Sequence, residues 1–442
     1  MENKKQDQME KIVALCKRRG FIFNASDIYG GFANTFDYGP LGAELKRNIK
    51  NEWWKKFVDK REDIVGLDSA IIQNPKIWEA SGHLTSFTDP LVECKKCNKR
   101  FREDQIEDAP KCEAGGEHEF AEAKDFNLMF QTSIGPTQEK DSIAYLRPET
   151  AQGIFANFKN VLDSTRVKIP FGIAQIGKAF RNEITPGNFI FRTLEFEQAE
   201  IEYFIEPDKE ESKKWYEKWI EETKNFYIDL GIDEKNLVLR EHDKDELSHY
   251  STGTSDIEYK FPFGVSELAG IAQRGDYDLA QHEKFSGEKI EYFDQENNKR
   301  FKPFVVEPSW GVDRALLAFI VDAYKESDGS DGRSEGEVVL SLSPKLAPNQ
   351  VAVFPLSKKD SLPEIAKKVH DQLQESGVRV FYDDGGSIGK RYRRQDEIGT
   401  PNCVTVDFDS KEDDSVTVRD RDTLLQERIK ISELNKYIAE KI

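Results

Sequence analysis

Charged residues of both signs recur in one stretch, Phe171 to Phe204, which reads FGIAQIGKAFRNEITPGNFIFRTLEFEQAEIEYF. Large apolar residues alternate there with Arg181, Glu183, Arg192, Glu195, Glu197 and Glu200. Arginine and carboxylate side chains bind ligand groups of opposite charge through strong hydrogen bonds. The stretch is therefore either a binding surface or a solvated face of an antiparallel sheet.

A second group of reactive side chains comprises Cys94, Cys97, Cys112 and His118, in ECKKCNKR and PKCEAGGEHEF. Two thiolates in a CxxC motif with two further soft ligands are typical of tetrahedral structural zinc. The segment is polar and has few apolar residues of its own, so a metal ion would stabilise it. The motif is incomplete, because Gly115 stands where a further cysteine is expected. The alternative is a short polar insertion with free thiols.

The elements that would position the first group form a hairpin. The apolar run of residues 171–176 predicts a strand, and the Pro-Gly sequence within residues 185–188 predicts a turn. Residues 189–192 begin the predicted return strand, which continues through the alternating acids. Because side chains alternate between the two faces of a strand, one face of this sheet would be apolar and the other charged.

Other elements flank the hairpin. Apolar residues four apart between Leu41 and Val58 predict an amphipathic helix, and the apolar run before Pro75 predicts a strand ending there. A helix is expected to follow Thr150 as its N-cap, with Glu149 just before it. A solvated helix is expected over residues 209–230.

Later segments place charges among small or apolar residues. Residues 245–282 contain two strand-like runs and carry Glu267 and Arg274 between small residues. Burying such charges costs free energy unless they are paired or functional. A further strand leads into Glu307 and then into an apolar helix whose first turn carries Arg314. We expect this arginine to point over the end of the sheet rather than into solvent.

The pattern changes near Leu346, where short apolar strands begin to alternate with amphipathic helices. This alternation predicts a separate α/β domain. Its segment SIGKRYRRQDEIGTP, with Arg391, Arg393 and Arg394, is the most positive short run of the chain. The run is either a local phosphate contact or a solvated helix face.

Composition limits the class of protein. The chain has 442 residues, 38% hydrophobic and 33% charged, which suits a globular protein of about two or three domains. A net charge of −18 disfavours a nonspecific nucleic-acid binder. Neither a transmembrane run nor a signal peptide is evident, so we expect a cytoplasmic protein with no membrane partner. Five cysteines do not form a disulfide framework.

Eight segments resemble, in order along nearly the whole chain, the signature regions of class II aminoacyl-tRNA synthetases, and most closely those of the homodimeric glycyl-tRNA synthetases. They are SDIYGGFANTFDYGPLG, NPKIWEASGHL, FNLMF, LRPETAQGIFANF, QIGKAFRNEITPGNFIFRTLEFEQAEIEYF, HYSTGTSDIEYKFPFG, EPSWGVDRALLAF and SIGKRYRRQDEIGTP. The resemblance implies an α+β fold. An antiparallel-sheet catalytic core (residues 1–345, with a polar insertion at 89–124) would precede an α/β anticodon-binding domain (residues 346–442).

The same resemblance implies an activity. The family activates glycine with ATP to form glycyl-adenylate and then transfers glycine to the 3′ end of tRNA(Gly). It implies glycine, ATP and tRNA(Gly) as partners, Mg²⁺ as a cofactor beside a structural Zn²⁺, and a homodimer. Arg391, Arg393 and Arg394 would contact the tRNA.

Roles for site residues also follow from the resemblance. Arg181 would be catalytic by holding the α-phosphate, and Arg314 by stacking on adenine near the γ-phosphate. The ATP-binding set would be Arg181, Asn182, Glu183, Phe191, Arg192, Phe196, Glu267, Leu268, Gly311, Asp313 and Arg314, with Glu267 a candidate Mg²⁺ ligand. The glycine-binding set would be Arg102, Glu149, Phe196, Glu197, Gln198, Glu200, Arg274, Glu307, Ser309 and Gly311. Such a pocket selects glycine by excluding larger side chains.

Two alternatives stay open at this point. A noncatalytic accessory or nucleic-acid-binding protein could share the fold, but it should have lost the charged ATP-binding residues, which are present here. A synthetase for proline, threonine or histidine would share the core and the C-terminal domain. The combination of EPSWGVDR with RPETAQG argues against these three specificities.

Overall fold

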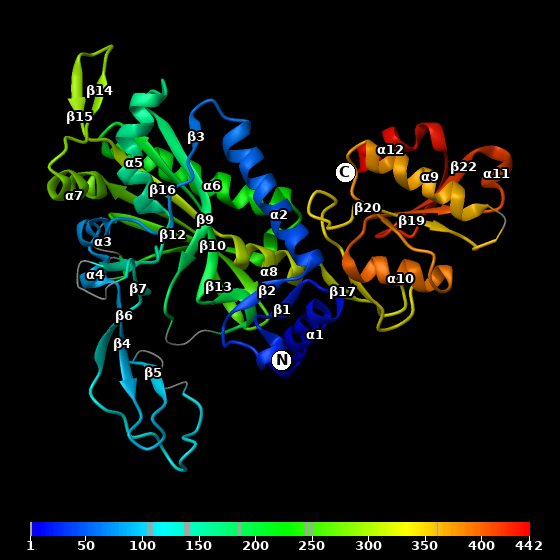
Figure 1. Cartoon of the computed structure of the whole chain (residues 1–442), viewed down its shortest axis with the longest axis horizontal. Coiled ribbons are helices and arrows are strands. Elements are labelled where there is room, and N and C mark those ends of the chain that lie inside the picture. Colours follow the sequence, from blue (N-terminus) through cyan, green and yellow to red (C-terminus); the bar gives the residue numbers. More distant parts are fainter. Residues whose placement is uncertain are drawn as a thin grey trace.

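A seven-stranded sheet forms the centre of the larger part of the molecule (Figure 1). Its neighbouring strands are antiparallel, except that β3 runs parallel to β9. The computed structural model describes residues 2–103, 106, 109–136, 142–183, 187–243, 246–247, 251–359 and 361–442. In spatial order the strands are β11 (Leu237–Glu241), β12 (Gly253–Phe261), β13 (Gly264–Gly275), β16 (Phe304–Gly311), β10 (Glu195–Ile205), β9 (Phe171–Phe180) and β3 (Ile64–Gly66).

The predicted hairpin consists of β9 and β10, which pair without interruption from Phe171↔Phe204 to Phe180↔Glu195. The predicted start of the return strand is wrong, because Phe189–Phe191 form a 3-10 helix, η5. Asn188 and Phe189 precede and open this helix with φ values of 56° and 60°. Positive φ is incompatible with a strand, and the return strand begins only at Glu195.

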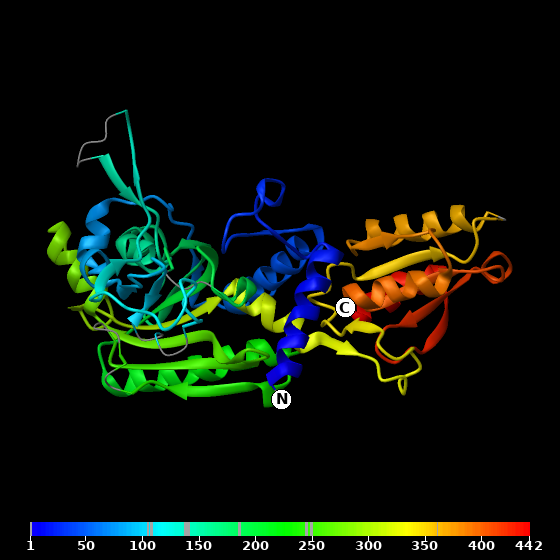
Figure 2. The same ribbon diagram turned by 90° about the horizontal axis from the view of Figure 1, so that it is seen from below.

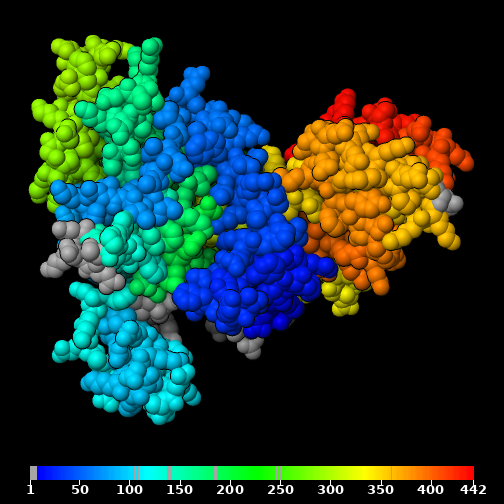
Figure 3. Space-filling view, viewed as in Figure 1, coloured from blue at the N-terminus to red at the C-terminus, as the bar shows by residue number. Residues whose placement is uncertain are grey.

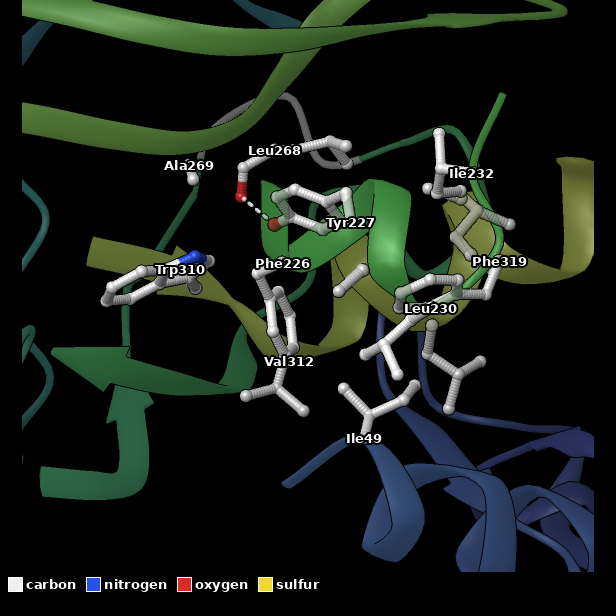
Figure 4. Close-up of a cluster of buried hydrophobic side chains, with 14 of the residues drawn as sticks. Ile49, Phe226, Tyr227, Leu230, Ile232, Leu268, Ala269, Trp310, Val312 and Phe319 are labelled. Carbon is white, nitrogen blue, oxygen red and sulfur yellow. Dashed lines mark hydrogen bonds between the residues drawn. The ribbon is translucent and has the colours of Figure 1, made fainter. Parts of the chain in front are cut away.

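Three helices cover one face of the sheet: α2 (Pro40–Trp54), α6 (Lys209–Asp229) and α8 (Val312–Ala323). Figure 4 shows Phe226 and Tyr227 of α6 beside Trp310 and Val312, which are all part of the main core. The predicted helices at residues 41–58 and 209–230 are confirmed, although the first ends as a π-helix, η2 (Lys55–Asp59).

The other face of the sheet carries α5 (Ala151–Ser164) and α7 (Tyr277–Ser286). Phe158 of α5 packs on Phe204, whose neighbours in β10 face the main core instead. The predicted strand up to Pro75 is wrong. β3 ends at Gly66, and Pro75 is the first residue of α3 (Pro75–Ala80), whose N-cap side chain is Asn74. Proline favours the first turn of a helix because its missing N–H would have no partner there.

Two further units extend from this body (Figure 3), and Figure 2 shows the C-terminal one from a second side. One is a three-stranded sheet of β5 (Arg100–Arg102), β4 (Thr88–Glu93) and β6 (Lys124–Asn127). The other has its own apolar core and a five-stranded sheet, in the order β20 (Val380–Tyr382), β19 (Val351–Pro355), β21 (Asn402–Val406), β22 (Ser415–Asp420) and β23 (Gln426–Lys430). Its helices are α9 (Leu362–Glu375), α10 (Ile388–Ile398), α11 (Ser410–Asp413) and α12 (Leu434–Lys441).

The remaining elements are short, apart from the N-terminal helix α1. They are α1 (Glu2–Arg19), β1 (Ile22–Asn24), η1 (Asp27–Tyr29), β2 (Phe36–Tyr38), α4 (His83–Ser86), β7 (Gln131–Ser133), β8 (Ile143–Tyr145), η6 (Glu234–Asn236), β14 (Tyr292–Asp294), β15 (Lys299–Phe301), β17 (Tyr324–Glu326), β18 (Val338–Leu340) and η7 (Ile431–Glu433). No helix in the described part of the chain is long and apolar enough to cross a membrane. Together the elements confirm the predicted α+β class.

Candidate active site

A cavity of about 330 Å³ lies over the face of the sheet that points away from the main core. Four strands of the sheet, the β9–β10 connection and the start of α8 supply its walls. The lining residues are Glu149, Arg181, Glu183, Ile190, Phe191, Arg192, Thr193, Phe196, Glu197, Gln198, Glu200, His242, Thr254, Asp256, Glu267, Gly270, Ala272, Glu307, Ser309, Gly311, Asp313 and Arg314. Most of the predicted ligands, although far apart in sequence, therefore meet in one place.

Two cavity arginines are held by aromatic rings and hydrogen bonds. Arg181 follows β9, and its guanidinium carbon lies 5.4 Å from the centre of the Phe196 ring, while Nε donates to a backbone carbonyl at 3.0 Å. Arg314, in the first turn of α8, lies 4.5 Å over the Phe191 ring, and its Nη1 is 2.9 Å from Glu267 Oε2. A guanidinium group fixed in this way keeps its plane, which suits paired donation to phosphate or stacking on a base.

A β-bulge decides which residues of β13 face the cavity. The pairing with β12 skips one residue at Leu268, so the alternation of side chains shifts by one at this point. Leu268 is fully buried in the main core (Figure 4). Glu267 and Gly270 consequently both line the cavity. Leu268, a residue of the predicted ATP-binding set, is not among the lining residues.

Glu200 is fixed by donors from two other segments. The amide of Thr150 donates to Oε2 at 3.1 Å, the Thr150 hydroxyl donates to the same oxygen, and Ser309 Oγ donates to Oε1 at 3.0 Å. Thr150 precedes α5 as predicted, but its hydroxyl does not cap that helix. Burial and the charge of Glu149 raise the pKa of Glu200, and the hydrogen bonds from Thr150 and Ser309 oppose this rise.

Glu149 and Glu307 complete the buried carboxylate group. Burial would raise the pKa of Glu149, but His83, with Nε2 at 3.4 Å, together with Arg274 and Gln152 holds this pKa below its usual range. Arg274 donates to Glu307 and, through Nε and Nη2, to Asp278 at 2.8 and 2.9 Å. Burial and neighbouring carboxylates nevertheless raise the pKa of Glu307 to about 8. A cation in the cavity would therefore be stabilised.

Some predicted ligands lie outside the cavity: Asn182, Leu268, Arg102 and Arg274 are not among its lining residues. Arg102 belongs to β5, where its Nη1 is 3.1 Å from Asp89 Oδ2. Arg274 is buried behind the cavity wall, with 2% of its surface exposed. Arg274 contacts the cavity wall through Glu307, to which it donates a hydrogen bond.

Two acidic residues line the cavity but use their carboxylates elsewhere. Glu197 lies 2.9 Å from the ammonium groups of both Lys46 and Lys50 of α2, because it belongs to the opposite face of β10 from Glu200. Asp313 accepts hydrogen bonds at 2.6 Å from Lys46 Nζ and from the Glu197 amide. These carboxylates join α2 and α8 to β10, while both residues border the cavity.

Further cavity residues were not predicted. His242 Nε2 lies 2.7 Å from Asp256 Oδ2. Burial and the charge of Glu267 raise the pKa of Asp256 to about 6, although His242 opposes this. Asp256 could have been predicted, because acidic and apolar residues alternate along β12. No spacing in the sequence marked His242, or His83 beside the carboxylate group.

The predicted metal ligands also come together. The ligand atoms of Cys94, Cys97, Cys112 and His118 all lie within 4.8 Å of one another, with 3.9 Å between the sulfurs of Cys94 and Cys112. Zinc–sulfur bonds of about 2.3 Å in a tetrahedron imply edges of about 3.8 Å. His118 Nε2 lies 2.7 Å from the Pro110 carbonyl oxygen, an outer contact that orients a metal-binding imidazole. The four residues therefore fit zinc.

The three arginines of α10 have different surroundings. Arg391 is 3% exposed and donates to two backbone carbonyls at 2.7 and 3.2 Å. These contacts hold its guanidinium group inside the domain. Arg393 pairs with Glu337 and Arg394 with Asp383, and their side chains are 53% and 37% exposed. These two arginines remain candidates for contact with a large partner.

Comparison with known proteins identifies the family. A family model described as the tRNA synthetase class II core domain (G, H, P, S and T) matches residues 130–324. The glycine–tRNA ligases of Thermobifida fusca and Caldanaerobacter subterraneus subsp. tengcongensis are 52% and 53% identical to this chain. The first alignment covers 99% of both chains and the second 98%. The chain belongs to the glycine–tRNA ligase family. This assignment confirms the resemblance and does not favour a noncatalytic accessory protein.

Other comparisons agree with this glycine–tRNA ligase assignment. A family model for an anticodon binding domain matches residues 350–441, which contain the five-stranded sheet. Among solved structures, prolyl-tRNA synthetase from Cryptosporidium parvum, complexed with halofuginone and AMPPNP, aligns with a TM-score of 0.68. The alignment covers 97% of this chain and 74% of that one, at 18% identity, and shows a shared fold.

Proposed function

We propose that the cavity joins glycine to ATP, releasing diphosphate, and that the glycyl group of the resulting adenylate then passes to the 3′ end of tRNA(Gly). The observation that carries this proposal is the meeting of fixed arginines and buried carboxylates in one small cavity. The reaction needs positioning and charge stabilisation more than a covalent nucleophile. Family membership supports glycine, ATP and tRNA as the substrates.

ATP would lie along the arginine-lined part of the cavity. We assign Arg181 to the α-phosphate, which it would reach together with the carboxylate of glycine, and Arg192 to the distal phosphates. Phe196 and Arg314 would stack on the two faces of adenine. Glu183 would accept a hydrogen bond from the adenine amino group.

Glu267 would be the protein ligand for Mg²⁺. It offers a carboxylate oxygen, the donor type that this ion prefers, and 46% of its side chain is exposed. When bound, the ion neutralises charge on the phosphates. The ion pair between Glu267 and Arg314 would keep the Glu267 carboxylate directed toward the phosphates.

Glycine would meet the buried carboxylates. Glu149, Glu200 and Glu307 would surround its ammonium group, and Ser309 would hold Glu200 in place, as it does here at 3.0 Å. Burial and the repulsion between carboxylates raise the pKa values of Glu200 and Glu307, and this cation would offset both effects. Size exclusion would reject larger amino acids.

Replacement of Arg181 by alanine tests the assignment of the α-phosphate. We expect ATP–diphosphate exchange to fall by about 100- to 1,000-fold, with an unchanged circular dichroism spectrum. Arg300→Ala is a matched control, because Arg300 also stacks on a phenylalanine ring, in the β14–β15 hairpin outside the cavity. Exchange by Arg181→Ala at the original rate would contradict the assignment.

We also propose a structural zinc ion at the cysteine–histidine group. The four ligands lie in the polar insertion of residues 89–124, whose apolar core is small. When bound, zinc would hold the two ends of this insertion together. It would take no part in the chemistry of the cavity.

The remaining proposals concern the whole molecule. We place the boundary between catalytic core and anticodon-binding domain at residues 345/346, and propose that Arg393 and Arg394 contact tRNA(Gly). We further propose a homodimer in the cytoplasm. Light scattering tests the dimer, and a monomeric mass under assay conditions would contradict it.

A further inference from the structure

One carboxyl group beside the site is buried without a partner. Glu202 lies two residues after Glu200 in β10 and is 0% exposed. Both of its carboxyl oxygens are inaccessible, and neither accepts a hydrogen bond from any residue that the structure describes. An ionised carboxylate in such a place would lose its hydration without a hydrogen bond to replace it. An unpartnered buried group of this kind requires an explanation.

The register of the sheet places Glu202 across from Glu307. Glu200 of β10 faces Ser309 of β16, so two residues further along β10, Glu202 faces Glu307. Residues directly opposite in an antiparallel pair project from the same face, with Cβ atoms about 4.5–5.5 Å apart. Glu307 already accepts a hydrogen bond from Arg274 through Oε2. Behind the cavity wall, two carboxyl groups are thus neighbours, and among the described residues only Glu307 accepts a hydrogen bond from a cation.

A metal ion does not account for this arrangement. Among the described residues, the side chains close enough to hold a metal are those of the cysteine–histidine group, and Glu202 is not part of it. The charged groups that face Glu202 are Glu200 of β10, Glu307 of β16, Arg274 of β13 and Asp278 of α7. Burial and the three carboxylates raise the pKa of Glu202 well above its usual range, and Arg274 opposes them. A proton on Glu202 would remove the charge and so compensate for its burial.

We propose that Glu202 is a neutral carboxylic acid that positions Glu307, by donating its O–H to the Glu307 carboxylate while Arg274 holds the other oxygen. Two donors would fix the plane of the Glu307 carboxylate. With the ammonium group of glycine beside it, Glu307 would carry the negative charge while Glu202 keeps the proton. Glu202 does not line the cavity, so it acts through Glu307 and not by contact with the substrate. The inference rests on the proposed role of Glu307 in glycine binding.

Two substitutions separate a hydrogen-bond donor from simple packing. Glu202→Leu keeps a side chain of similar size but removes the donor, and we expect the KM for glycine to rise about tenfold, with the KM for ATP unchanged. Glu202→Gln offers an N–H donor in the same place and should restore most of the affinity. Glu195→Gln is the matched control, because Glu195 lies on the same strand, is half-exposed and pairs with Lys178. Leucine and glutamine variants with equal KM values for glycine would overturn the proposal.

The protonation state is tested directly. At pH 7 the infrared difference spectrum between wild type and Glu202→Gln should contain the carbonyl band of a protonated carboxylic acid. In the wild type the KM for glycine should rise at alkaline pH, as Glu202 loses its proton, more steeply than in Glu202→Gln. Absence of the band, or identical alkaline profiles, would overturn the inference.

Glu307→Gln distinguishes this inference from the proposed glycine site on which it rests. If Glu307→Gln leaves the KM for glycine unchanged, the proposed site is wrong. If it raises this KM while the Glu202 variants match the wild type, the site stands and only the role of Glu202 is refuted. An acid band that Glu307→Gln removes and Glu202→Gln retains would place the proton on Glu307 instead.

Discussion

Replacement of Arg314 by lysine isolates what the planar guanidinium group contributes to ATP binding. The guanidinium lies 4.5 Å over the Phe191 ring, Nε donates to the Phe191 carbonyl at 3.2 Å, and Nη1 lies 2.9 Å from Glu267. Lysine keeps the charge but concentrates it on one ammonium group. It cannot cover the ring while also reaching the carbonyl and the carboxylate.

The size of the effect follows from these contacts. A hydrogen bond involving a charged group contributes about 1.5–3 kcal/mol, and a cation–π contact contributes about 0.5–1 kcal/mol when partly exposed. Loss of one such bond and of the ring contact costs about 2–4 kcal/mol. This corresponds to a roughly 30- to 1,000-fold decrease in kcat/KM for ATP.

The assay is ATP–diphosphate exchange at saturating glycine over a range of ATP concentrations. The KM for glycine, measured at saturating ATP, should change little, because Arg314 is assigned to the nucleotide. Arg300→Lys, outside the cavity, is the control for the chemical change itself. A wild-type kcat/KM for ATP in Arg314→Lys would refute the proposed stacking arrangement.

Three further predictions concern stability and metal content. Burial would raise the pKa of Asp63, but hydrogen bonds from Arg61 and Tyr203 outweigh it and leave the pKa lowered. Asp63→Asn should therefore lower the free energy of unfolding by about 1–2 kcal/mol at neutral pH, and urea titrations should show this loss shrinking as the pH falls through the lowered pKa. Equal losses at neutral and low pH would contradict this reasoning. Gly42→Ala in α2 should lower Tm despite a propensity gain of about 1 kcal/mol, because the new Cβ would lie 1.8 Å from the Phe21 carbonyl oxygen. Gly389→Ala in α10, with nothing within 4 Å of the Cβ, should raise Tm, and the same sign for both would be inconsistent with the packing described. Chelator-washed protein should retain about one zinc ion per chain by elemental analysis, and Cys97→Ser should lose it, whereas metal-free wild-type protein would exclude the zinc site.

The sequence predicted the parts of the site that follow from regular periodicity. Alternating residues defined the hairpin of β9 and β10, and the segments that resembled the synthetase family supplied Glu149, Glu267, Glu307 and Arg314 from elsewhere. The structure brings all four to the same cavity. Strand alternation and motif order were sufficient here, because these residues lie in or next to regular strands and helices.

Irregular backbone and burial were not predictable in the same way. The bulge at Leu268 places Glu267 on the cavity face and Leu268 in the core, the reverse of what uninterrupted alternation would give. No feature of the sequence predicted this bulge. Glu197 lies three residues before Glu200 in β10, and residues an odd number apart project from opposite faces of a strand. Glu197 therefore pairs with lysines of α2 instead of joining the buried carboxylates. Arg391 looks like its neighbours in α10, and only the packing of that helix shows that it is buried.

The central claim is that this cavity activates glycine with ATP. ATP–diphosphate exchange, measured with the purified protein and each amino acid separately, tests it most directly. We expect glycine alone to stimulate exchange, and Arg181→Ala to abolish most of the stimulation. Exchange stimulated by a larger amino acid, or by none, would contradict it.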